Sequence, residues 1–250
     1  MNKLHIRSLA LGAALSLAMG GTALAGVINF GSLNATENSS LGPSITVNQN
    51  NVTLNAWAVV ASGTPPSWTN STCPMAGSTG TTANPCLFFK YTSGDMSETG
   101  LGLTPNPNDE IFNPAGIALQ VTTPNEFLSS VNIGSVQTGE SWQVLGCSMA
   151  GPGFGSCNSL GGGVGGQNGT SMVTVSGLNA THYDSYIVDV PCMNDSTSCM
   201  IDGKNYGATN GSNNIVLMSA TTVPEPGTLA LMAAGLFGLG WMVRRRRARQ

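Results

Sequence analysis

The sequence is poor in charge, above all in positive charge. Charged side chains make up 8% of the 250 residues, and seven of the nine Lys and Arg residues lie within the first or the last seven positions. Residues 26–223 contain two lysines against eleven acidic residues, a net charge of −9. Because so few cations cannot neutralise phosphates, this composition argues against nucleic acid as a partner.

Familiar metal-binding and catalytic patterns are scarce as well. His182 is the only histidine after residue 25, and no Cys-x-x-Cys pair occurs, so zinc is not expected. His182 lies in a turn-like stretch without a nucleophile elbow, which argues against a serine triad. Gly161–Gly166 matches Gly-x-Gly-x-x-Gly, but a strand follows it where dinucleotide binding requires a helix.

The N-terminal 25 residues have the pattern of a secretory signal peptide. Lys3 and Arg7 precede the apolar segment Leu9–Met19, and Ala23-Leu24-Ala25 supplies a small-x-small cleavage pattern. We therefore expect residues 1–25 to be removed during export and Gly26 to be the mature N-terminus.

The C-terminal end combines a Pro-Glu-Pro triplet, a charge-free apolar run and a cluster of arginines. The prolines at 224 and 226 restrict the backbone, so the triplet is expected to be extended and exposed. As a helix, the 16 residues of the apolar run would span about 24 Å, which is short but workable for a bilayer core of about 30 Å. The arginines place the C-terminus on the cytoplasmic side. We expect a linker at 221–227, a transmembrane helix at 228–243 and a basic cytoplasmic tail at 244–250.

This order of features resembles the PEP-CTERM sorting signal of Gram-negative bacteria. The matching residues are Pro224-Glu225-Pro226, the stretch Thr228–Val243 and the basic Arg244–Arg249. In that family an exosortase, a membrane-embedded transpeptidase, recognises the signal during export to the cell surface or the exopolysaccharide matrix. The resemblance implies that Pro224, Glu225 and Pro226 are the recognition element, that an exosortase is the partner and that the chain is anchored transiently in the inner membrane. A plain single-pass anchor that follows two prolines is the alternative.

The six cysteines all lie in the exported part. An even number in an oxidising compartment predicts three disulfides, with fifteen connectivities formally possible. The cysteines form three local couples, so we favour Cys73–Cys86, Cys147–Cys157 and Cys192–Cys199. Bridges over such short loops are expected to pin loops rather than the core.

Short apolar and β-branched runs separated by turn-rich stretches predict an all-β domain over residues 26–220, an antiparallel β-sandwich that is jelly-roll-like. The predicted strands are Val27–Leu33, Ile45–Val47, Val52–Val60, Leu87–Tyr91, Gly116–Thr122, Phe127–Val136, Trp142–Leu145, Ser171–Ser176, Ser185–Val190 and Asn214–Ala220. The predicted long loops are Ser62–Pro85, Cys147–Gly169 and Pro191–Asn213. The segment Ser93–Gly146 also resembles a β-rich domain of PEP-CTERM proteins without established activity, which carries no chemistry with it.

Two kinds of binding site remain to be weighed. Asp95, Glu98, Asp109 and Glu110 form the densest acidic group, and calcium takes several oxygen ligands from irregular loops, so these four residues are a candidate calcium site. The alternative is that they are solvated turn residues. A carbohydrate-binding module, with or without calcium, would use an exposed Trp57 or Trp68, whereas Trp142 is expected to pack inside.

A glycoside hydrolase is less favoured. It needs two acids about 5 to 9.5 Å apart across a cleft, and sequence spacing indicates no such pair. We therefore predict an exported cell-surface or exopolysaccharide-matrix protein without catalytic activity of its own, which an exosortase processes at its C-terminus.

Overall fold

The computed structural model of the chain describes residues 25–63, 66–106, 108–150, 153–165, 172–193, 196–209, 214–225 and 235–236. The chain divides into two units, Gly26–Thr222 and the two ends, residues 1–25 with 223–250. Three predicted segments lie outside the described residues: the signal peptide except residue 25, the transmembrane helix 228–243 except residues 235–236, and the whole tail 244–250. Within the residues that are described, no helix is long and apolar enough to cross a membrane.

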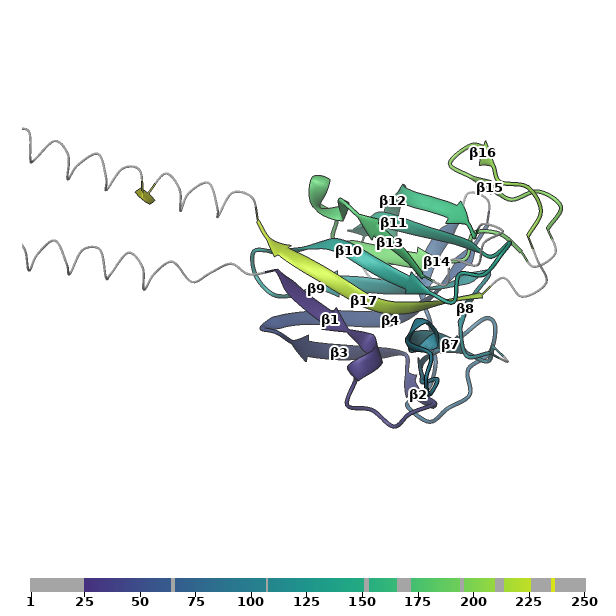
Figure 1. Ribbon diagram of the computed structural model, residues 1–250, viewed down its shortest axis with the longest axis horizontal. Helices are drawn as coiled ribbons and strands as arrows, with labels where there is room; N and C mark the ends of the chain where they lie inside the picture. Colours follow the sequence, from purple (N-terminus) through teal and green to yellow (C-terminus); the bar gives the residue numbers. More distant parts are fainter. Residues whose placement is uncertain are drawn as a thin grey trace, which may run out of the picture. The chain divides into compact units, whose positions relative to one another are not determined.

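The first sheet has eight strands and is centred on the last strand of the chain (Figure 1). Its main path is β13 (Met172–Ser176), β10 (Glu126–Gly134), β17 (Asn214–Pro224), β7 (Gly100–Thr104), β6 (Cys86–Lys90) and β2 (Ser39–Gly42). Strands β1 (Gly26–Asn29) and β8 (Ile111–Phe112) also pair with β17.

The second sheet has seven strands. Its path is β12 (Gly153–Val164), β11 (Ser141–Ala150), β14 (Ser185–Asp189), β9 (Ala115–Val121), β4 (Val52–Ser62) and β3 (Ser44–Gln49), and β5 (Ser67–Asn70) pairs with β4. The remaining elements are the small hairpin β15 (Met200–Ile201) and β16 (Lys204–Asn205), and the 3-10 helices η1 (Phe30–Ser32), η2 (Met96–Glu98) and η3 (Leu178–Ala180).

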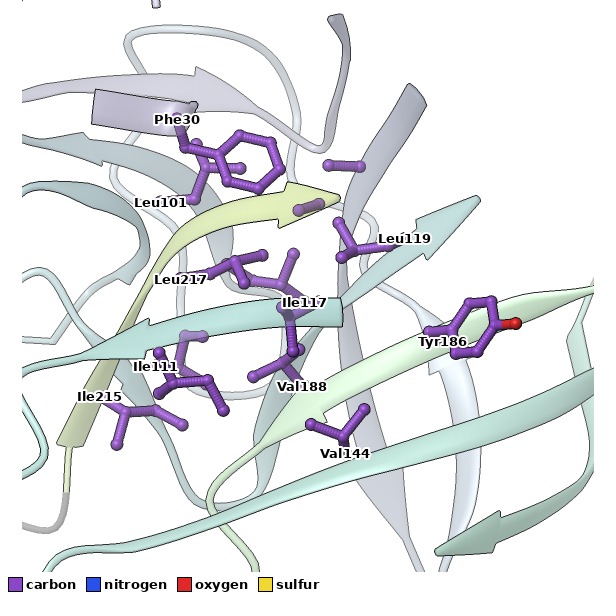
Figure 2. Close-up of a cluster of buried hydrophobic side chains, with 14 of the residues drawn as sticks. Phe30, Leu101, Ile111, Ile117, Leu119, Val144, Tyr186, Val188, Ile215 and Leu217 are labelled. Atoms are coloured by element: carbon purple, nitrogen blue, oxygen red, sulfur yellow. The ribbon is translucent and has the colours of Figure 1, made fainter. Parts of the chain in front are cut away.

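One hydrophobic core lies between the two sheets (Figure 2). Leu101 and Leu217 enter it from the first sheet, and Ile117 and Val188 enter it from the second; all four are fully buried. Successive side chains of a strand point to opposite faces, so Ile187 leaves this core and joins a second cluster on the outer face of the second sheet. Two antiparallel sheets around one core confirm the prediction of an all-β fold, and the jelly-roll connectivity stays a prediction.

All ten predicted strands are present, but the predicted strand Val27–Leu33 ends at Asn29, and Phe30–Ser32 form η1. The other errors fall mainly in segments rich in glycine or turn residues. β12 occupies most of the predicted loop Cys147–Gly169, while β5, β15 and β16 lie in the other two predicted loops. In β12 a Cβ on Gly163 would lie 3.2 Å from a ring carbon of Trp142, so the glycine accommodates an aromatic ring. The predicted strand Asn214–Ala220 continues to Pro224 as β17, so the first four residues of the predicted linker 221–227 are strand.

The structure contains the three disulfides that the local couples favour, Cys73–Cys86, Cys147–Cys157 and Cys192–Cys199. The expectation that these bridges pin loops rather than the core is wrong for one of them. Cys147 and Cys157 face each other on β11 and β12, and Cys147 is fully buried in the outer cluster. This bridge therefore ties two strands of the second sheet together, because the segment predicted as a loop forms β12.

Candidate functional site

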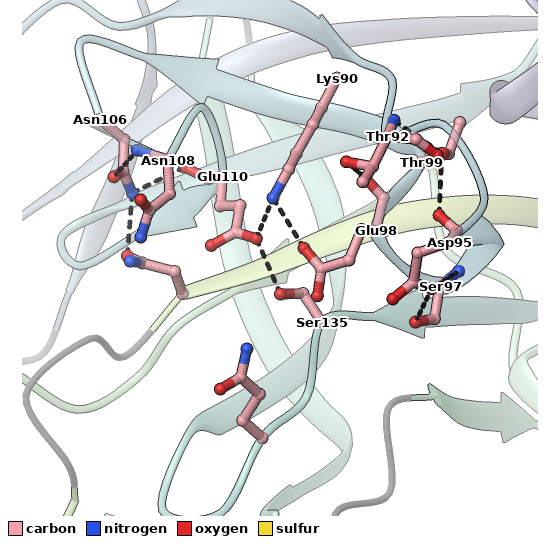
Figure 3. A network of polar contacts seen from close by, with 12 residues as sticks. Lys90, Thr92, Asp95, Ser97, Glu98, Thr99, Asn106, Asn108, Glu110 and Ser135 are labelled. Carbon is pink, nitrogen blue, oxygen red and sulfur yellow. Dashed lines mark hydrogen bonds and ion pairs between the residues drawn. The ribbon is translucent and has the colours of Figure 1, made fainter.

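The largest polar network of the acidic segment is centred on Lys90, the last residue of β6 (Figure 3). The Lys90 ammonium lies 2.7 Å from a carboxylate oxygen of Glu98, at the end of η2, and 2.5 Å from one of Glu110. Ser135 donates a hydrogen bond of 2.7 Å to the same Glu110 oxygen. One cation is thus shared by two acids that come from different loops.

Burial and ion pairing shift the pKa values of these side chains in opposite directions. Burial disfavours the charged form of Lys90, but its hydrogen bonds to Glu110 and Glu98 outweigh burial and raise its pKa. Burial raises the pKa of Glu110, which is only 4% exposed. At Glu98 burial is opposed by the hydrogen bond from Lys90, and the pKa is lowered. Lys90 therefore stays protonated and supplies the positive charge that the two carboxylates need.

The four predicted calcium ligands do not converge on one point. Glu98 and Glu110 meet through Lys90, whereas the Asp95 carboxylate accepts hydrogen bonds from the backbone N–H and the hydroxyl of Ser97 at 2.9 and 2.6 Å. These bonds lower the pKa of Asp95, and burial raises that of Asp109. In the described part of the chain, no group of three or more His, Cys, Asp or Glu side chains could hold a metal ion. Calcium binding at the four residues stays a prediction.

Glu140 is a buried acid that the sequence reasoning missed. It is 3% exposed, directly before β11, and accepts a hydrogen bond of 2.7 Å from the backbone N–H of Gln137. Burial and, to a smaller extent, the charges of Glu110 and Glu98 raise the pKa of Glu140 to about 7, against the lowering effect of its backbone hydrogen bonds. In the sequence, only the neighbouring turn residue Gly139 pointed to Glu140, and a turn next to a strand does not reveal whether an acidic residue in it is buried.

The aromatic residues are not arranged as the carbohydrate-binding alternative assumed. Trp68 is only 4% exposed, and Trp57 is half-buried and stacks on Phe154 with the ring centroids 6.2 Å apart. The expectation of an exposed Trp57 or Trp68 is therefore wrong. Trp142 packs against the main core as expected, and His182 lies edge-on to Phe127 at 4.6 Å.

The predicted recognition element begins at the end of the central strand of the first sheet. Pro224 is the last residue of β17 and Glu225 follows it; both are half-buried, which is less exposed than expected, and Pro226 lies outside the described residues. The antiparallel ladder of β1 and β17 pairs Gly26 with Thr222, which is fully buried (Figure 1). The predicted mature N-terminus is thus paired with the residue two positions before Pro224.

Comparison with known proteins adds one finding to this geometry. A family model of the PEP-CTERM protein-sorting motif matches residues 222–247. The match begins at the last residue of β17 that pairs with β1 and ends within the arginine cluster. A search of curated proteins finds no match to the chain.

Proposed function

Because this chain carries a PEP-CTERM protein-sorting motif at residues 222–247, we propose that it is an exported cell-surface or exopolysaccharide-matrix protein. An exosortase processes its C-terminus. The stretch 228–243 holds the chain in the inner membrane until it is processed, with residues 244–250 in the cytoplasm. The matched motif, which follows directly on a folded β domain, is the observation that carries this proposal.

The chemistry of the domain supports export. All six cysteines are paired, and such bridges persist in oxidising compartments rather than in the cytosol. The small number of cations in residues 26–223 also fits a hydrated exterior that does not bind phosphate-rich polymers.

We further propose that the chain has no catalytic activity and is itself a substrate. The two acids that meet at Lys90, Glu98 and Glu110, share its charge, and the Asp95 carboxylate accepts its hydrogen bonds from Ser97. Pro224, Glu225 and Pro226 act as the recognition element.

The intact mass of the protein recovered from its native cells tests the proposal. We expect a mass that lacks both residues 1–25 and the arginines 244–249. In a Glu225→Ala variant we expect the unprocessed C-terminus to accumulate in the membrane fraction. Glu37→Ala, which removes an exposed acid outside the motif, is the matched control and should be processed normally.

Two outcomes would contradict this function. A mass that retains the arginines in cells containing an exosortase would show that the C-terminus is a permanent anchor. Normal processing of a triple Pro224→Ala, Glu225→Ala, Pro226→Ala variant would show that recognition does not depend on the triplet.

A further inference from the structure

A cavity of about 650 Å³ lies over the outer face of the second sheet. Its wall includes Trp68 on β5, Gln143 on β11, Ser159 on β12 and Asp189 on β14, and Asp202 beyond β15 completes it. A volume of this size is typical of small-molecule sites, which range from about 300 to 1,000 Å³.

Asp189 is the unusual residue of this cavity. Its neighbour Val188 enters the main core, so strand alternation directs Asp189 to the outer face, where the cavity lies. Its partners across the ladder are Gly116, which has no side chain, and Gln143. Asp189 is 5% exposed, and its Oδ1 has no hydrogen-bond partner among the described residues. Buried carboxyl groups are normally hydrogen-bonded, so an unpaired one facing a cavity calls for a ligand or an ordered water.

The other polar groups of the wall supply both donors and acceptors. The indole N–H of Trp68 is buried and is also unpaired. Gln143 donates from its amide to the Ser159 hydroxyl at 3.1 Å, and Ser159 donates to the Asp202 carboxylate at 2.7 Å. The wall therefore combines a buried carboxyl that has an unpaired oxygen with a polar chain of three residues that ends at a second acid.

We propose that this cavity binds a neutral, hydroxyl-rich molecule, a single sugar or a polyol of similar size. A hydroxyl group can both donate to and accept from the Asp189 carboxyl, whereas an ammonium group can only donate. An anionic sugar would meet two acids and no lysine or arginine among the lining residues that the structure describes.

The protonation of Asp189 agrees with an uncharged ligand. Burial raises the pKa of Asp189 to about 8, so the group is mostly neutral at pH 7. A neutral carboxyl offers a donor as well as an acceptor and has no charge that would favour an amine. This inference is independent of exosortase processing, so either proposal can fail without the other.

The test is isothermal titration calorimetry at pH 7 on the full chain, purified in a detergent without a sugar headgroup. The neutral probes are glucose, galactose, mannose and N-acetylglucosamine, compared with glucuronate and putrescine. We expect at least one neutral sugar to bind and both charged probes to bind more weakly. Asp189→Ala removes the hydrogen-bonding group of the side chain and should weaken sugar binding by about tenfold or more.

Two further variants keep the experiment decisive if Asp189→Ala folds poorly. Asp202→Asn changes an exposed residue of the wall and should also weaken binding, whereas Glu37→Gln removes an exposed carboxylate outside the wall and should leave binding unchanged. The proposal is overturned if no neutral sugar binds, if putrescine or glucuronate binds more tightly than the sugars, or if neither wall variant weakens binding.

Discussion

At the scale of single residues, the two lysines of the exported domain have different surroundings. The Lys90 ammonium is shared by two acids that are mostly shielded from water, with side-chain exposures of 15% for Lys90, 20% for Glu98 and 5% for Glu110. The Lys204 ammonium lies 4.7 Å above the ring of Tyr206 on an exposed hairpin. Removing the charge of Lys90 should therefore lower the stability of the fold more than removing the charge of Lys204.

Lys90→Met is expected to lower the free energy of unfolding by roughly 3 kcal/mol, because it leaves two shielded carboxylates without their cation. Lys204→Met should cost about 1 kcal/mol or less, as for an exposed cation–π contact. Urea denaturation of both variants at pH 7 measures the difference. Equal destabilisation would mean that Lys90 is no more than a surface charge.

The Lys90→Met variant, compared with the wild type, also tests the predicted calcium site. If Asp95, Glu98, Asp109 and Glu110 hold calcium, excess calcium should raise the melting temperature of the wild type above its value in chelator. If the ammonium occupies that position, calcium should stabilise Lys90→Met and leave the wild type unchanged. A melting temperature that does not respond in either protein removes the calcium prediction.

Asp189 makes stability depend on pH in a predictable direction. Its pKa is about 8 in the folded chain against an ordinary value of 3.8, so the folded state binds more protons than the unfolded state between these values. Stability must therefore fall as the pH rises from about 4 to about 8, by an amount on the order of a few kcal/mol. Asp189→Asn should flatten this part of the profile, which urea denaturation at pH 5 and pH 8 measures. An unchanged slope would show that Asp189 ionises as a solvated acid does.

At the scale of elements, glycine in this protein serves packing within strands. β7 has the sequence Gly-Leu-Gly-Leu-Thr, and a Cβ on Gly102 would overlap the backbone oxygen of Asp109. At Gly153, the first residue of β12, the nearest atom to a new Cβ is the Trp68 carbonyl oxygen at 3.9 Å. Gly102 lies within a strand and Gly153 begins one, but only at Gly102 would a side chain clash with a neighbouring backbone.

Gly102→Ala is accordingly expected to lower the free energy of unfolding by about 2 to 3 kcal/mol, since the backbone of residue 109 must move. Gly153→Ala should change it by less than about 0.5 kcal/mol. Thermal melts of the two variants beside the wild type separate these cases. A Gly102→Ala variant as stable as Gly153→Ala would mean that the loop before β8 adjusts freely.

At the scale of the whole molecule, the domain is completed by its last strand. β17 pairs with β1, β7, β8 and β10, so it joins segments from the beginning and the middle of the chain. Its last three residues, 222–224, are also the first three of the sorting motif. The first sheet thus cannot be completed without the residues at which the sorting motif begins.

A chain truncated after residue 225 should fold, whereas one truncated after residue 213 should not, because the second lacks the centre of the first sheet. The near-UV circular dichroism and the protease resistance of the two truncated chains, made with all three disulfides formed, measure this difference. Protease resistance in the shorter chain would show that β17 is an accessory strand.

Sequence reasoning found the strands that are rich in apolar and β-branched side chains. It missed the glycine-rich strands β7 and β12 and five strands of two to four residues, β2, β5, β8, β15 and β16. β4 and β14 are rich in apolar residues, and their pattern alone identifies them. β7 and β12 were missed because glycine is as frequent in loops as at points where backbones or rings approach closely. Only the tertiary structure shows which of these reasons applies.

The local order of residues was sufficient for the all-β class, the three disulfide couples and the C-terminal sorting motif, because each depends on neighbours in the chain. Tertiary structure decided what depends on distant partners. It placed Lys90 between Glu98 and Glu110, buried Trp68, and left Asp189 unpaired beside a cavity. Burial and pairing are set by which side chains meet in the folded structure, and the pattern along the chain carries no record of them.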